Sequence, residues 1–146
     1  ARNAGICVTG NYIFGLPTDT YETMEETLNE AMTTEIDYFN GYSCMAYPGS
    51  ELHRQAAQNN PEYLPENNEA GWLGYSQHSY ECYPLPTNNL KNWEVLKFRD
   101  EAFMRYFTNP EYVDRMVSKF GDSFKQEMDR MLDITLPRKI VEENAS

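Results

Sequence analysis

The residues best placed to do chemistry lie in two short turns, each of which follows an aromatic, β-rich segment. The first segment begins at Ile6 and stops at Gly15-Leu16-Pro17, and the second runs from Ile36 to Tyr47 and stops at Pro48-Gly49-Ser50. A helical pattern follows each turn, and α/β proteins bind ligands where strands give way to helices. Glycine lets a ligand approach the backbone closely, and proline stiffens the chain that leaves the turn. We predict that the two turns belong to one ligand site.

The spacing of Gly10 and Gly15 superficially matches a phosphate-binding loop. Such a loop continues with Lys and then Ser or Thr, which hold the phosphates and Mg²⁺. Leu16 and Pro17 occupy those places here, which excludes an NTPase site. The alternative to a ligand site is a plain Gly-Pro turn after a buried strand.

The histidines and cysteines form no metal-binding or nucleophilic pattern. A metal site built from His78, Glu81 and Cys82 would need further ligands, and no second His or Cys cluster lies near them in the sequence. The three cysteines, an odd number without close pairs, fit reduced thiols better than a disulfide framework: Cys7, Cys44 and Cys82. We expect structural thiols, and we assign no catalytic residue and no metal to this segment.

Two successive strand–helix units predict an α/β fold with a parallel sheet. The helix of the first unit lies between Thr18 and Thr34, with Asp19 as its expected N-cap and Glu22 as the reciprocating residue of a capping box. Its apolar positions recur every three or four residues and predict one buried stripe: Tyr21, Met24, Leu28 and Met32.

The rest of the chain divides into an irregular connection over residues 59–88 and a helical segment over residues 89–146. The connection carries Asn, Pro, Gly and Tyr, and its apolar residues do not recur at a regular spacing. Its aromatic residues suggest the rim or lid of an active site. A helix with a broad apolar face is expected between Leu90 and Thr108. A second begins at Asn109-Pro110 and ends at Gly121, and Asp122 caps a last helix that Pro137 terminates.

Composition excludes several classes of protein. The chain is 40% hydrophobic, which predicts a globular fold. A formal charge of -11 and a pI near 4.5 argue against a nucleic-acid partner, because phosphate binding needs clustered Lys and Arg. No apolar run reaches the ~20 residues of a membrane span and no signal peptide opens the chain, so we expect no membrane partner and a cytoplasmic protein.

In their order, these motifs resemble the C-terminal part of radical S-adenosylmethionine enzymes, most closely the subgroup that often carries a cobalamin-binding domain. The resemblance covers almost the whole chain and rests on the following segments: Gly10–Thr20 (GNYIFGLPTDT), Glu22–Thr27, Tyr47–Leu52 (YPGSEL), Tyr75–Thr87, Phe98–Phe107 and Lys119–Gly121. It implies that residues 1–58 are the closing βα units of an incomplete (β/α) TIM-like barrel. The connection and the helical C-terminal segment would follow that barrel.

The resemblance also implies cofactor-binding residues. In that family the fifth strand holds the adenosyl group around a Gly-x-Ile-x-Gly-x-x-Glu pattern, on which Asn11, Ile13 and Gly15 fall. Asn11 replaces the first glycine and Thr18 replaces the glutamate.

The turn after the sixth strand reaches the adenine in that family, which adds Tyr47, Pro48 and Gly49 to the implied cofactor site. The Tyr47 ring has two interpretations, stacking on a base and simple packing.

Enzymes of this family cleave S-adenosylmethionine at a 4Fe-4S cluster that a Cys-x-x-x-Cys-x-x-Cys loop holds, and this sequence has no such loop. The chain opens at Ala1–Gly5, which resembles the end of a helix with Gly5 as its C-cap. We therefore expect a C-terminal fragment of a longer polypeptide, inert alone, whose partners are the upstream part of that polypeptide and a small-molecule substrate. Cobalamin is a candidate further cofactor.

Open sheet edges predict that the isolated chain associates with itself. The alternative function is a non-catalytic binding or interaction module with an α/β core.

Overall fold

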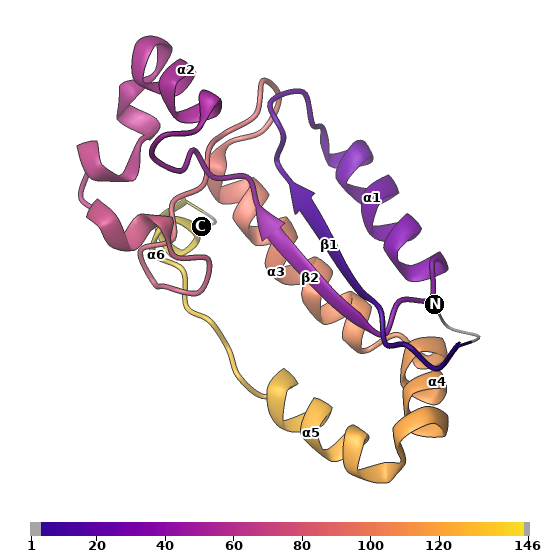
Figure 1. The fold of residues 1–146 in the computed structure, drawn as a ribbon. Coiled ribbons are helices and arrows are strands. Elements are labelled where there is room, and N and C mark those ends of the chain that lie inside the picture. Colours follow the sequence, from indigo (N-terminus) through magenta and orange to yellow (C-terminus); the bar gives the residue numbers. More distant parts are fainter. Residues whose placement is uncertain (1–3, 145–146) are drawn as a thin grey trace.

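Two parallel strands, β1 (Thr9–Phe14) and β2 (Tyr38–Ser43), lie at the centre of the computed structural model, which describes residues 4–144 (Figure 1). They pair from Thr9 opposite Tyr38 to Phe14 opposite Ser43. Helix α1 (Tyr21–Thr33) connects them. The predicted α/β class and the parallel pairing are confirmed, and the sheet has two strands in the described part of the chain.

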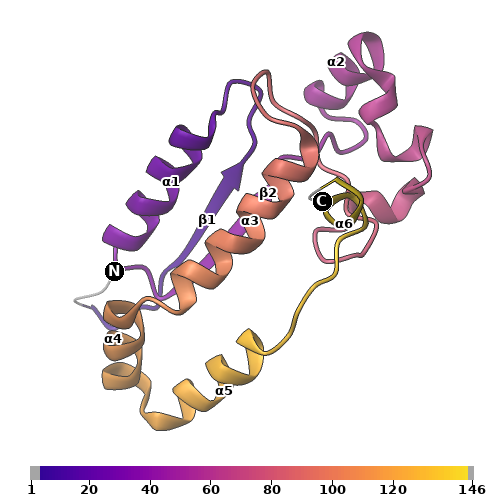
Figure 2. The ribbon, with the colours of Figure 1, turned by 180° about the vertical axis from the view of Figure 1, so that it is seen from behind.

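The remaining elements are helical. Their bounds are α2 (Glu51–Asn59), the 3₁₀ turns η2 (Pro61–Tyr63), η3 (Pro65–Asn67) and η4 (Gly71–Tyr75), α3 (Asn92–Phe107), α4 (Pro110–Phe120), α5 (Asp122–Leu132) and α6 (Lys139–Asn144). Figures 1 and 2 show α3 running along the back of the sheet, with α2, the 3₁₀ turns and α6 gathered beyond the end at which both strands finish. Within residues 4–144, no helix combines the length and the apolar character that a membrane crossing requires.

Only one face of the sheet is covered by protein in the described structure. On that face the Phe14 ring meets Phe98 of α3 edge-on at 5.2 Å, and the Phe39 ring stacks on Tyr106 of α3 at 4.6 Å. Successive strand residues point to opposite faces, so the alternate positions of both strands form an open face. Five of these are exposed and the last is half-buried: Thr9, Asn11, Ile13, Tyr38, Asn40 and Tyr42.

The two edges of the sheet differ. Side chains close the outer edge of β2: Gln77 donates to the Ser43 carbonyl at 2.9 Å and accepts from the Ser43 N–H at 3.1 Å, and Arg99 donates to the Gly41 carbonyl at 2.8 Å. Gln77 thus takes the place of a neighbouring strand. Within residues 4–144 no strand pairs with the outer edge of β1. The N–H and C=O groups of successive strand residues point to opposite edges. Those of Asn11, and of the β1 residues two positions before and after it, therefore face the open edge.

Two predicted helix starts are wrong. Thr20, not Asp19, is the N-cap of α1, and Thr23 rather than Glu22 completes the capping box. Asp122 does not cap α5 but is its first residue. Tyr21, placed in the buried stripe of α1, is 47% exposed.

The boundaries of α4 are confirmed, because the Asn109 side chain accepts the Glu111 N–H and Gly121 follows the last helical residue with φ of 83°. Pro137 does not end the helical region, since α6 follows it. The helix expected to end at Gly5 would occupy residues that lie mostly outside the described part of the chain. Gly5 itself has φ of 71°.

Asp37 connects the start of β2 to α4. Its side chain is 2% exposed, and its carboxylate accepts the Val8 N–H at 2.8 Å and the Lys119 ammonium at 2.6 Å. Burial raises the pKa of Asp37, but the Lys119 and Val8 hydrogen bonds lower it more, so that the pKa in the folded protein lies below its ordinary value.

A carboxyl group with a lowered folded pKa stabilises the native state above its unfolded pKa, and this contribution is lost as the pH falls through the folded pKa. We expect Asp37→Asn to reduce the free energy of unfolding at pH 7 by about 1–3 kcal/mol. We also expect the variant to lose less stability than the parent between about pH 5 and pH 2. Urea unfolding across this range measures both. Asp129→Asn, which alters an ion pair with a 58% exposed carboxylate, is the control and should cost less than about 0.5 kcal/mol. Parallel pH profiles for the parent and Asp37→Asn would contradict the prediction.

Candidate ligand site at the carboxyl ends of the strands

Both predicted turns lie at the same end of the sheet, because the strands are parallel (Figure 1). Gly15-Leu16-Pro17 follows β1 directly. The pairing extends one residue past β2, where the Cys44 N–H donates to the Phe14 carbonyl at 2.8 Å. Three buried residues, 44–46, then lead to the second turn at Tyr47.

The first turn is held from inside by Asp19. Gly15 has φ of 83°, and the N–H groups of Gly15 and Leu16 both donate to Oδ2 of Asp19, at 3.0 and 2.8 Å. Two adjacent N–H groups of this kind can bind an anion. The chain supplies that anion itself through Oδ2 of Asp19, while Oδ1 accepts the Thr23 hydroxyl at 3.0 Å and the N-cap position falls to Thr20.

The end of the irregular connection buttresses the same turn. The Asn88 N–H donates to the Pro17 carbonyl at 2.9 Å, and the Thr87 hydroxyl donates to the Asp19 carbonyl at 2.9 Å. Asn89 donates its side-chain amide to the Asp19 carbonyl at 3.1 Å. The connection therefore ends against the first turn.

The second turn presents an aromatic ring that is half exposed. The Ser50 N–H donates to the Tyr47 carbonyl at 3.0 Å, which closes the turn, and the Ser50 hydroxyl accepts the His53 N–H to start α2. Gly49 has φ of 88°. The Tyr47 ring lies 5.8 Å from that of Tyr75 in a stacked arrangement and remains 47% exposed. Tyr47 thus packs against the protein and also keeps surface for a ligand.

A network that the sequence did not reveal fixes Tyr75 beneath Tyr47. The Tyr75 hydroxyl donates to Glu66, and His53 Nε2 lies 2.8 Å from the other carboxylate oxygen. Burial raises the pKa of Glu66, but hydrogen bonds from Tyr75 and His53 lower it below the ordinary value. Burial and the Glu66 charge raise the pKa of Tyr75. Glu66 and Tyr75 lie in the irregular connection. Its apolar residues do not recur at a regular spacing, so the sequence does not predict that these two residues approach α2.

The structure places the predicted site residues in three positions. Asn11 and Ile13 point to the open face of β1, Gly15 forms the first turn, and Tyr47-Pro48-Gly49 forms the second. Sequence reasoning missed Asn40 and Tyr42 of β2, which share the open face. The alternation of β2 around buried Phe39 is the signal that could have found them.

Two of the three thiols and both histidines take structural positions. Cys44 and Cys82 are buried, as expected, whereas Cys7 is exposed. Burial raises the pKa of Cys82 to about 11. Burial lowers the pKa of His78, and neighbouring guanidinium groups lower it further. Across residues 4–144, no group of three or more His, Cys, Asp or Glu side chains could hold a metal ion.

Comparison with known proteins relates the chain to a methyltransferase. It is 35% identical over 116 residues to an uncharacterized methyltransferase, PH0819, from Pyrococcus horikoshii. The match covers 77% of this chain and 23% of that relative, so the chain spans less than a quarter of the relative's length. No protein-family profile matches the chain, and no solved structure matches it significantly.

Proposed function

We propose that this chain forms the closing βα units of a radical S-adenosylmethionine enzyme and that its two turns seat the adenosyl group of the cofactor. The observation that carries the proposal is the parallel pairing, which brings Gly15-Leu16-Pro17 and Tyr47-Pro48-Gly49 to one end of the sheet. Ligands of α/β proteins bind at this end. The name of the relative, a methyltransferase, is compatible with S-adenosylmethionine as methyl donor.

The residues at this end suit an adenosyl group better than a nucleotide. Asp19 already satisfies the N–H groups of Gly15 and Leu16, so they are not left for a phosphate, and S-adenosylmethionine carries none. Ile13 offers an exposed apolar side chain and Tyr47 an exposed aromatic ring. Apolar surface with a few polar groups is the usual lining of a cofactor site.

The open edge of β1 supports a larger sheet. Gln77 and Arg99 close the edge of β2, whereas Asn11 and its alternate neighbours leave backbone groups facing outward on β1. Natural proteins rarely leave such an edge unprotected. We therefore assign it to an upstream strand of the same polypeptide, and we propose that the isolated chain associates through it.

The iron-sulfur cluster belongs to another part of the polypeptide in this proposal, because residues 4–144 offer no group of ligands for it. When bound, a 4Fe-4S cluster supplies the electron that cleaves S-adenosylmethionine. The role of this chain is to position the adenosyl group and to exclude water from the substrate. We also propose that the full-length protein uses cobalamin as a methyl carrier. We place it in the cytoplasm.

The test uses the full-length protein, purified without oxygen. We expect it to carry an iron-sulfur absorption band and to release 5′-deoxyadenosine from S-adenosylmethionine when reduced. Ile13→Glu should weaken cofactor binding, measured by equilibrium dialysis, at least about tenfold, because it places a charge against the adenosyl group. Ile134→Glu alters a side chain that is 66% exposed between α5 and α6 and should leave binding unchanged. A full-length protein that binds neither iron nor S-adenosylmethionine would refute the proposal and favour the non-catalytic module.

A further inference from the structure

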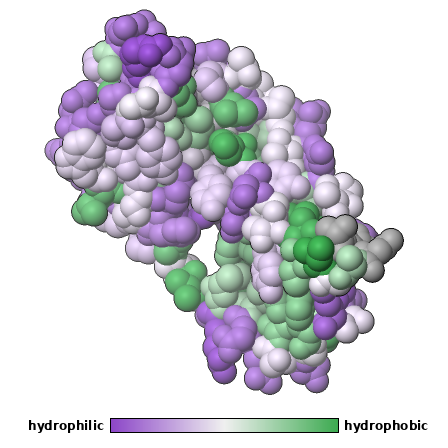
Figure 3. Space-filling model, in the orientation of Figure 1, coloured by the Kyte–Doolittle hydropathy of each residue, from purple (hydrophilic) through white to green (hydrophobic). Residues whose placement is uncertain are grey.

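The open face of the sheet carries no charged side chain. Its six positions are Thr9, Asn11, Ile13, Tyr38, Asn40 and Tyr42. Charged residues make up 24% of the chain, and an exposed surface of α1 carries Glu22, Glu26 and Glu30. Parallel sheets occur almost only with both faces covered. Figure 3 looks onto the open face, where hydrophilic, intermediate and hydrophobic residues adjoin one another over the strands. This face is therefore built to contact something other than water.

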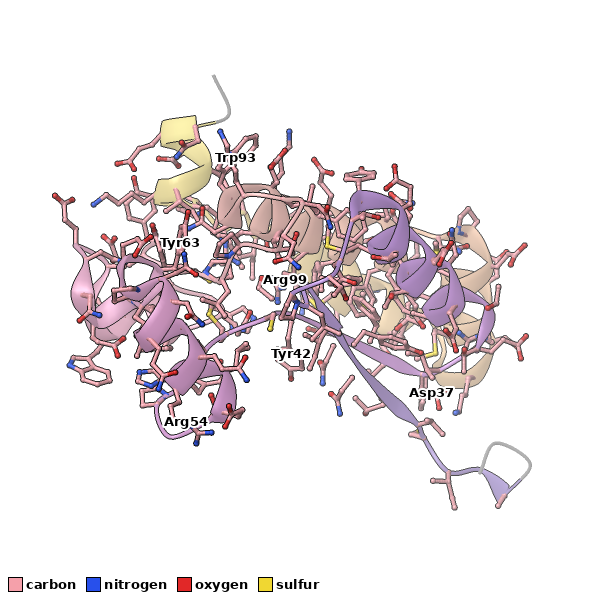
Figure 4. The ribbon with its side chains drawn as sticks, turned by 90° about the horizontal axis from the view of Figure 1, so that it is seen from above. Asp37, Tyr42, Arg54, Tyr63, Trp93 and Arg99 are labelled. Atoms are coloured by element: carbon pink, nitrogen blue, oxygen red, sulfur yellow. The ribbon has the colours of Figure 1, made fainter. Side chains whose placement is uncertain are left out.

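Polar atoms on this face have capacity for further hydrogen bonds. The Asn40 amide donates to Oδ1 of Asn11 at 3.0 Å, which leaves the Asn11 amide group and the Asn40 carbonyl oxygen for other partners. Tyr42 points away from α3, on the opposite side of β2 from Arg99 (Figure 4), and its hydroxyl has no hydrogen-bond partner among the described residues. Covering these atoms with apolar protein would cost about 1–3 kcal/mol for each unsatisfied group. The occupant of the face must itself offer donors and acceptors.

The same residues adjoin the proposed adenosyl site. Asn40 pairs with Asn11, and Tyr42 pairs with Ile13, so that the row of β1 residues assigned to the cofactor continues directly onto β2. We assign the occupant next to the cofactor as the substrate, and the six side chains of this face offer it no ion pair. An uncharged group with both donors and acceptors matches the Asn40 amide and the Tyr42 phenol.

We propose that Asn40 and Tyr42 bind the substrate beside the adenosyl group, and that the part of the small-molecule substrate on this face is an uncharged amide-type group. The inference rests on the proposed function and adds the substrate class. A charge placed at Asn40 then repels or fails to pair with this group, and loss of the Tyr42 hydroxyl removes one hydrogen bond to it.

The test measures methyl transfer and cofactor binding separately in the full-length protein. S-adenosylmethionine labelled in its methyl group is incubated with the reduced enzyme and a protein-free extract of the producing cells, and labelled compounds are counted after chromatography. We expect Asn40→Asp and Tyr42→Phe to reduce label transfer at least about tenfold. For Tyr42→Phe, which leaves the Asn40–Asn11 hydrogen bond intact, the dissociation constant for S-adenosylmethionine should change less than about twofold. Asn29→Asp, on an exposed position of α1, should change neither quantity.

Three results would overturn the inference. Unchanged label transfer in both variants would mean that the face only packs against protein. An equal loss of cofactor binding in Tyr42→Phe would assign Tyr42 to the cofactor. Label that appears only in nucleic acid or polysaccharide, or in no compound, would refute a small-molecule substrate. A wild-type protein that does not bind S-adenosylmethionine refutes the proposed function itself and is recognised before any variant is compared.

Discussion

Gly15→Ala is expected to lower the free energy of unfolding by about 3 kcal/mol, because the substitution combines two costs. Gly15 has φ of 83°, a backbone conformation that costs a residue with a Cβ roughly 1–2 kcal/mol. A Cβ at this position would also lie 2.4 Å from Cγ1 of Val95, and Val95 is fully buried. Overpacking of a buried contact costs typically about 1–3 kcal/mol. Urea unfolding monitored by far-UV circular dichroism measures the sum.

Gly49→Ala separates the two costs. Gly49 has φ of 88°, close to that of Gly15, but a Cβ there would meet no atom within 4 Å. We expect it to cost only about 1–2 kcal/mol, the backbone part. In the double variant Gly15→Ala/Val95→Ala, the Gly15 change should cost no more than the Gly49 change. Equal losses for Gly15→Ala and Gly49→Ala in the otherwise unchanged chain would show that Val95 does not constrain the turn.

The sequence predicted that Gly15 permits a sharp turn after a strand, because this property belongs to the residue and its immediate neighbours. It could not predict Val95, which packs against the turn from 80 positions away. The order of strands and helices and the boundaries of α4 were similarly predictable from local signals at Asn109, Pro110 and Gly121. These signals act over a few residues and depend little on the rest of the fold.

The wrong assignments arose where adjacent residues could fill one role. Asp19 and Thr20 are both good N-caps, and the turn before them favours Thr20, since its N–H groups bind Oδ2 of Asp19. Gln77, which takes the place of a strand at the edge of β2, lies in a segment whose apolar residues do not recur at a regular spacing. Its role depends on where the connection folds back, and local patterns do not specify that.

The C-terminal helix α6 is attached to the rest of the fold through Arg138. The second large loss of stability is expected when this residue is replaced. Residues 133–137, which precede it, are all exposed and cross from α5 as an extended segment (Figures 1 and 2). The Arg138 side chain is 3% exposed and donates to both carboxylate oxygens of Asp100, at 2.8 and 3.0 Å, and to the Ser79 carbonyl at 2.9 Å. Asp100 also accepts from Arg99, which reaches the Gly41 carbonyl of β2.

Arg138→Met is expected to lower the free energy of unfolding by about 2–4 kcal/mol. Removing one partner of a largely buried ion pair is destabilising, because the remaining charge loses much of its compensation. The value lies below that of a fully buried pair because the Asp100 side chain is 27% exposed and keeps its bond to Arg99. Ile140 packs in one cluster with Cys82, so the loss of α6 should uncover this thiol. In the parent chain Cys7 should react fast with Ellman's reagent, and Arg138→Met should add Cys82 as a second fast-reacting thiol.

Arg130→Met is the matched control for this change. Arg130 forms an ion pair with Glu127 on α5 in which the side chains are 69% and 70% exposed, and such pairs contribute about 0–1 kcal/mol. The control should leave Cys82 protected and the urea midpoint nearly unchanged. If Arg138→Met matched the control in both the midpoint and the thiol count, α6 would be held by apolar packing alone, and the Arg138–Asp100–Arg99 chain would not secure it to the edge of β2.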